Sequence, residues 1–107
     1  MNKIIEINNL IKEFQFGNKE KSYKKLLQIL SEEKEDLLLR FNVAVIEQKL
    51  NLIEEAKLNY EYILKKEDNI KAMVNLYNLN IKEEKFEKSL ILINKILMTN
   101  NSLEFVY

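Results

Sequence analysis

The sequence predicts an all-α protein in which three antiparallel helical hairpins, six helices in all, stack one on the next and precede a short C-terminal tail. Three observations predict this fold. An apolar stripe with helical spacing occurs three times, capping residues recur with the same period, and the 107 residues contain no proline. A repeat of this length is typical of proteins whose helical hairpins bury their apolar faces against one another.

Each stripe ends in an Ile-Leu pair, and Ile29, Ile63 and Ile96 stand 34 and 33 positions apart. Within a stripe, the offsets i, i+4, i+7 and i+8 place four side chains on one face of an α-helix. We interpret this face as the core-facing side of the second helix in each hairpin. The three stripes are Ser22, Leu26, Ile29 and Leu30; Ala56, Tyr60, Ile63 and Leu64; and Ser89, Ile93, Ile96 and Leu97.

Local signals place the six helices in order. Gly17-Asn18 is a turn signal between the first two helices, Asn51 marks the turn between the third and fourth, and the charged residues 83–85 separate the last two. The predicted helices cover residues 4–16, 19–30, 37–49, 53–65, 70–82 and 86–98. Isolated helices of this length are marginal in water, so stacking must stabilise them.

Three capping residues divide the chain into repeats. Asp36, Asn69 and Ser102 recur at intervals of 33, and each precedes an apolar residue, where a helix N-cap belongs. The repeats cover about 3–36, 37–69 and 70–102, and residues 103–107 begin a partial fourth repeat, so that residues 1–107 form one domain.

The pattern resembles the tetratricopeptide repeat, a family with two antiparallel helices in a unit of about 34 residues. The middle repeat carries the resemblance in Phe41-Asn42-Val43-Ala44, Asn51, Ile53, Glu54-Glu55-Ala56, Tyr60 and Ile63-Leu64. The family also expects a small residue where the two helices cross, and Ser22, Ala56 and Ser89 supply it.

The repeats are degenerate members of that pattern. The family's tryptophan position holds Glu6, Arg40 and Met73, its first-helix tyrosine position holds Glu13, Glu47 and Asn80, and its small residue near the end of the second helix is replaced by Ile29, Ile63 and Ile96. The closing proline is missing throughout.

The resemblance implies a concave groove along the first helices. Asn8, Asn42 and Asn75 fall at the family position that faces this groove, where an amide can pair with the backbone of an extended peptide. The alternative is that these amides are solvated. The other groove residues implied are Ile7, Ile11, Phe41, Val45, Lys71, Val74 and Asn78. For these residues the alternative is ordinary packing between adjacent first helices.

The function we expect is a protein-interaction module that binds a peptide or helix of a partner protein in this groove. The alternatives are a structural, self-associating repeat unit, and a fragment or accessory domain of a longer repeat protein. Self-association is suggested by a last helix that is apolar on all sides. The residues for a homo-oligomer contact are Leu90, Ile91, Leu92, Leu103, Phe105 and Tyr107.

Composition argues against other classes. The chain has no Cys or His and only one Gly, so we expect no catalysis, no metal and no cofactor. Lys and Arg number 17, as do Asp and Glu, which argues against nucleic acid. No apolar run is long enough for membrane insertion, and no secretory signal is evident, so we expect a cytoplasmic location.

One specific ligand mode of the family is not expected. Some members hold a C-terminal carboxylate with a clamp of two Lys, two Asn and one Arg. Asn42 and Lys71 match two of those positions, whereas Ile7, Ile11 and Asn75 do not match the other three.

Overall fold

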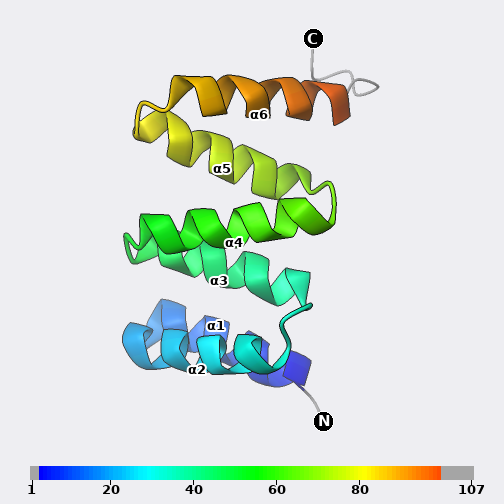
Figure 1. Ribbon diagram of the computed structural model, residues 1–107. Helices are drawn as coiled ribbons and strands as arrows, with labels where there is room; N and C mark the ends of the chain where they lie inside the picture. Colours follow the sequence, from blue (N-terminus) through cyan, green and yellow to red (C-terminus); the bar gives the residue numbers. More distant parts are fainter. Residues whose placement is uncertain (1–2, 100–107) are drawn as a thin grey trace.

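The protein is all-α within residues 3–99, the part of the chain that the computed structural model describes (Figure 1). The six helices are α1 (Lys3–Phe16), α2 (Lys19–Glu32), α3 (Leu37–Lys49), α4 (Ile53–Lys66), α5 (Ile70–Lys82) and α6 (Phe86–Thr99). The predicted all-α class and the six predicted helices are confirmed, and each helix end lies within two residues of its predicted place. Ser102 and the predicted start of a fourth repeat lie outside the described residues.

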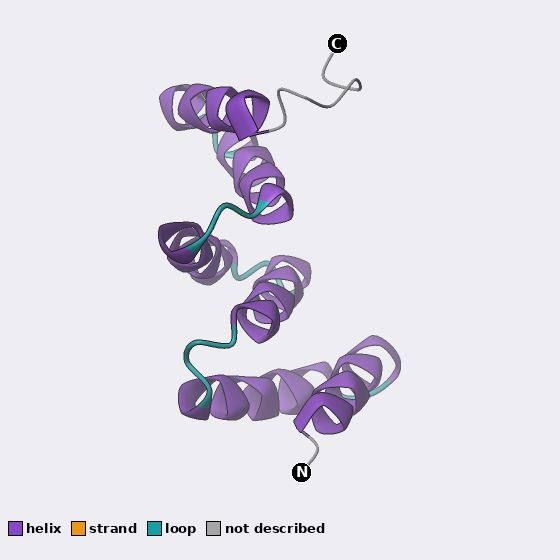
Figure 2. Ribbon diagram, turned by 90° about the vertical axis from the view of Figure 1, so that its right-hand side faces the viewer, coloured by secondary structure: helices purple, strands orange, loops and turns teal. Residues whose placement is uncertain are grey.

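The helices pack in sequence order. The pairs α1–α2, α3–α4 and α5–α6 form antiparallel hairpins, and α2–α3 and α4–α5 join one hairpin to the next. The body measures 41 × 29 × 23 Å. Figure 2, turned by 90°, shows the hairpins following one another, with α1 and α6 at opposite ends of the described part of the molecule.

Side-chain caps fix where three of the helices begin. Asp36 Oδ1 accepts a hydrogen bond of 2.9 Å from the Leu39 backbone N–H, and Asn69 Oδ1 accepts one of 3.0 Å from that of Ala72. Asn18 caps α2 in the same way. Because a capping oxygen satisfies one of the free N–H groups of the first turn, Asp36 and Asn69 mark where the second and third hairpins begin, and Asn18 marks the turn within the first. The predicted caps Asp36 and Asn69 are confirmed.

The apolar core consists of two clusters that meet at α3. The first cluster contains Ile7, Leu10, Phe14, Leu26, Ile29, Leu30, Leu39, Val43 and Ile46. The second contains Ala44, Ala56, Tyr60, Ile63, Ala72, Leu76 and Leu79. Leu39, Val43 and Ile46 of α3 face the first cluster, whereas Ala44 of α3 belongs to the second.

The predicted stripes supply six of the sixteen residues in these two clusters, namely Leu26, Ile29, Leu30, Ala56, Tyr60 and Ile63. Ser22, Ala56 and Ser89 are buried, with exposed fractions of 0%, 0% and 2%, as expected for small residues where two helices cross. The last stripe is the least buried, since Ile93 is half-buried and Leu97 is 42% exposed. The second helix of the third hairpin therefore has an open side that α2 and α4 lack.

None of the helices within residues 3–99 combines the length and the apolar character that crossing a membrane requires.

Candidate functional site: a groove on the first helices

Two adjoining hollows form a groove beside the N-terminal half of α3. The larger, of about 290 Å³, lies between the start of α3 and the start of α5. The smaller, of about 70 Å³, lies between α1 and the start of α3. The larger hollow is lined by Leu37, Leu38, Phe41, Asn42, Glu67, Asn69 and Lys71, and the smaller by Ile4, Ile7, Asn8, Asp36, Leu38, Leu39 and Asn42.

Leu38 and Asn42 line both hollows, one helical turn apart on α3. Leu38 is 72% exposed, an unusual environment for a leucine on a helix whose neighbours Leu39 and Val43 are fully buried. Asn42 is half-buried, and its amide offers both donors and an acceptor. The centre of the groove thus combines an accessible apolar side chain with an adaptable polar one.

The structure brings half of the predicted groove residues together. Ile7 and Asn8 line the smaller hollow, Phe41 and Lys71 line the larger, and Asn42 lines both. Ile7 also belongs to the first core cluster, so its side chain serves as the floor of the groove.

The other predicted groove residues line neither hollow. Ile11 is half-buried and packs against the first core cluster, and Val45 is also half-buried. Val74 and Asn78 are exposed on α5. That a partner contacts these four residues stays a prediction.

Asn75 differs from Asn8 and Asn42 because its amide is engaged inside the protein. Its Nδ2 donates a hydrogen bond of 3.0 Å to the hydroxyl of Tyr60, which in turn donates to Oε1 of Gln48. Tyr60 is fully buried, and desolvation raises the pKa of its hydroxyl. These two hydrogen bonds join α3, α4 and α5, so the amide of Asn75 stabilises the packing of the third hairpin on the second.

Sequence reasoning missed Leu38, the most exposed residue at the centre of the groove. The signal was the run Leu37-Leu38-Leu39, because three successive side chains span about 200° around a helix and cannot all face one core. Leu39 is buried at 1% exposure and Leu37 is half-buried, which leaves Leu38 facing outward.

A larger hollow, of about 680 Å³, lies around the end of α2 and the turn that follows it, at residues 31–36. It is formed by consecutive residues of one segment, all of which except Ser31 are charged. The groove on α3 is the better candidate because it lies between helices and includes apolar side chains.

A buried carboxylate lies behind the groove, on the opposite side of α3. Glu47 is 2% exposed and accepts hydrogen bonds from the hydroxyl of Tyr23 at 2.7 Å and from Nδ2 of Asn59 at 2.6 Å. Burial raises the pKa of Glu47, although both hydrogen bonds act in the opposite direction. Arg40 donates to Oδ1 of Asn59 at 2.9 Å and stacks on the ring of Tyr62.

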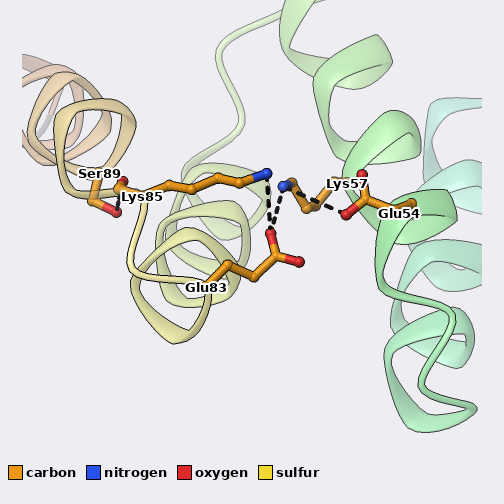
Figure 3. Close-up of polar contacts among 5 residues, drawn as sticks. All are labelled: Glu54, Lys57, Glu83, Lys85 and Ser89. Carbon is orange, nitrogen blue, oxygen red and sulfur yellow. Dashed lines mark hydrogen bonds and ion pairs between the residues drawn. The ribbon is translucent and has the colours of Figure 1, made fainter.

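A second polar group joins the second hairpin to the third (Figure 3). Lys57 of α4 is 5% exposed, and its Nζ donates a hydrogen bond of 2.7 Å to Oε1 of Glu83, which lies at the end of α5. Lys85 also approaches Glu83, at 3.4 Å, and Glu54 lies 3.9 Å from Lys57. Hydrogen bonding to Lys57 lowers the pKa of Glu83.

Both polar clusters join neighbouring hairpins. Both oxygens of Glu47 accept hydrogen bonds, Oε1 of Glu83 pairs with Lys57 and Lys85, and neither carboxylate lines the groove. Within residues 3–99, no three acidic side chains lie close enough together to bind a metal ion, and the sequence supplies no His or Cys. What the groove can do chemically is offer apolar contacts and amide hydrogen bonds.

The residues predicted for self-association fall into three groups. Leu90 and Ile91 are 61% and 68% exposed on α6, whereas Leu92 is half-buried and packs against the second core cluster. Leu103, Phe105 and Tyr107 lie outside the described residues.

Comparison of the chain with known protein families, with curated proteins and with solved structures gives no match, so the assignment of this site depends on its geometry.

Proposed function

We propose that the chain is a protein-interaction module without catalytic activity, and that it binds an extended or helical segment of a partner protein in the groove on α3. In this proposal the three hairpins form a short stack of the tetratricopeptide type, with the first helices providing the binding face. The observation that carries the proposal is the pair of adjoining hollows, which share the exposed Leu38 and the amide of Asn42.

The chemistry of the groove favours a peptide with an apolar side chain flanked by accessible backbone. Leu38 and Phe41 offer apolar contacts, and the larger hollow, of about 290 Å³, has room for one such side chain. Asn42 can donate to a peptide carbonyl and accept from a peptide N–H. Lys71 and Glu67 at the rim offer charges of both signs, which gives no preference for a strongly charged ligand.

The experiment is selection of peptides from a displayed random library on the immobilised full chain, followed by affinity measurements on variants. Leu38→Asp and Asn42→Ala are expected to weaken the selected peptides at least about tenfold, as truncation of interface anchors does. Leu58→Asp is the matched control, because Leu58 is 66% exposed on α4 and lines neither hollow.

Backbone amide shifts measured by NMR provide a second readout of where a selected peptide binds. Residues around Asn8, Asn42 and Lys71 are expected to shift on addition of peptide. Selected peptides that bind Leu38→Asp as tightly as the parent chain, or that shift residues away from the groove, would contradict the proposal.

A further inference from the structure

The third hairpin has an exposed apolar surface on the side that faces away from the second hairpin. We call this surface the end face. It consists of Val74, Tyr77 and Ile81 of α5 and Phe86, Leu90, Ile93 and Leu97 of α6. Phe86 and Leu90 are 62% and 61% exposed, and charged residues of the turn between α5 and α6 flank the surface beside Phe86. The α6 members have the spacing i, i+4, i+7 and i+11, which forms one stripe along the helix.

The corresponding positions of the second hairpin are covered by the third. Thirty-three positions before the α6 stripe lie Ile53, Lys57, Tyr60 and Leu64 of α4. Tyr60 is fully buried, Lys57 is nearly so, and Ile53 and Leu64 pack against the second core cluster. The cover is α5, which reaches this face through the bonds Asn75–Tyr60 and Lys57–Glu83. Within residues 3–99, no helix occupies the equivalent place on α6.

The opposite end of the molecule cannot supply this cover in a head-to-tail arrangement. Leu39, Val43 and Ile46 are the α3 residues of the first core cluster, and 34 positions earlier α1 has Ile5, Asn9 and Lys12. Asn9 and Lys12 are exposed, and stacking α1 on the end face of another copy would bury an amide and an ammonium group against leucine and phenylalanine. The cost of desolvating these groups without partners opposes such a contact.

The end face is complementary to itself. In an antiparallel pairing about a two-fold axis, the α6 stripe of one copy meets the same apolar stripe of the other. The partly exposed side chains offer on the order of 500 Å² of apolar surface per copy, about 1,000 Å² for two copies, which is the size of a weak, reversible interface.

We propose that the end face is a two-fold interface with a second copy of this chain, in which α6 packs antiparallel against α6 of the partner. This interface is separate from the groove, since none of its residues lines either hollow. A dimer would therefore present two copies of the groove, and failure of one proposal leaves the other untouched.

The test is sedimentation equilibrium of the full chain over a wide concentration range. The expected result is a concentration-dependent rise from 12.8 kDa to twice that mass. Leu90→Glu places two carboxylates in the interface, and we expect it to weaken dimerisation at least about 100-fold. Circular dichroism should show an unchanged helix content. Leu58→Glu, at a position 66% exposed on α4, is the control and should dimerise like the parent chain.

A cross-linking experiment distinguishes this geometry from other dimers. The sequence contains no cysteine, so Leu90→Cys introduces a single thiol near the two-fold axis. Mild oxidation should join two copies in high yield, whereas Leu58→Cys should give only slow, collisional cross-linking. Equal yields would overturn the proposal. A parent chain that stays monomeric over the whole concentration range would also overturn it.

Discussion

The hydroxyl of Tyr23 on α2 donates a hydrogen bond of 2.7 Å to Oε2 of Glu47 on α3 and so joins the first hairpin to the second. Lys57 stands 34 positions after Tyr23, and it joins the second hairpin to the third through Glu83. The same position of two successive hairpins therefore carries a long polar side chain that reaches a carboxylate of the next hairpin. These two contacts make the stability of the chain dependent on pH.

Replacement of Glu47 by Gln should remove a pH-dependent loss of stability. Because burial raises the pKa of Glu47 in the folded chain, the unfolded chain releases this proton first as the pH rises. The contribution of Glu47 to the free energy of unfolding is thus complete at low pH and is lost as the pH rises through the raised pKa. Urea unfolding should measure the free energy of unfolding of both chains at pH 4 and pH 7. The value for Glu47→Gln minus that for the parent chain should be larger at pH 7 than at pH 4.

The other titrating groups, Glu83 included, are present in both chains and cancel from that comparison. Parallel pH profiles for the parent chain and Glu47→Gln would show that the carboxyl group of Glu47 titrates alike in the folded and unfolded states.

The pair Lys57 and Glu83 should respond unequally to removal of either partner. Glu83→Gln leaves the buried ammonium group of Lys57 with only Glu54, 3.9 Å away, whereas Lys57→Met leaves Glu83 solvated and paired with Lys85. Removing the counter-ion of a buried charge is the more costly change. We expect a lower thermal midpoint at pH 7 for Glu83→Gln than for Lys57→Met, and the reverse order would contradict this account.

The acid limb offers a check on the same pair. Hydrogen bonding to Lys57 lowers the pKa of Glu83, so this contribution is present above the ordinary carboxyl range and is lost as the pH falls through the lowered pKa. The stability of Lys57→Met should therefore fall less steeply below pH 5 than that of the parent chain.

Replacing Ala56 by serine should change the free energy of unfolding little, whereas replacing it by leucine should lower it. It is fully buried where α3 and α4 cross, so Ala56→Leu should cost about 1–3 kcal/mol of unfolding free energy or more through overpacking. The equivalent residues Ser22 and Ser89 donate from Oγ to the backbone carbonyl four positions earlier, at 2.8 and 3.0 Å. Ala56→Ser can do the same toward Leu52, and denaturant titration should place it within about 1 kcal/mol of the parent.

Replacing Glu84 by glycine should stabilise the folded chain. Its φ of 60° lies in the left-handed region, which is strained for a residue with a Cβ, and its side chain is exposed. The strain relieved, about 1–2 kcal/mol, exceeds the entropy that glycine loses on folding, about 0.5–1 kcal/mol. Glu84→Gly is therefore expected to raise the free energy of unfolding by a net amount of about 0.5–1 kcal/mol. Lys95→Gly, in the interior of α6 at an exposed position, is the control and should destabilise the chain by about 0.5–1 kcal/mol.

Local features of the chain were predictable from the sequence, whereas contacts between distant residues were not. Asp36 and Asn69 cap helices as their position before an apolar residue indicates, and the small residues Ser22 and Ala56 are buried as the period indicates. These features depend on near neighbours and on one helix face, which periodicity reports directly.

The burial of Glu47 shows where periodicity fails. Glu47 appeared as a departure from the family pattern, yet it lies in the interior because Tyr23 and Asn59, 24 and 12 positions away, provide its hydrogen bonds. Asn75 was predicted to face a ligand, and its amide is bonded to Tyr60, 15 positions away. Whether an amide meets water, ligand or a buried hydroxyl depends on tertiary contacts that one helix's spacing does not encode.

The division of α3 between the two core clusters has a consequence for how the chain opens. Hairpins that contact only their neighbours can detach from either end, while the element shared by both clusters opens only when both are lost. Amide protons of α3 should therefore exchange with solvent most slowly, and those of α1 and α6 most quickly. Because Leu38 and Asn42 also belong to α3, the candidate binding residues are on the part of the chain whose backbone opens last.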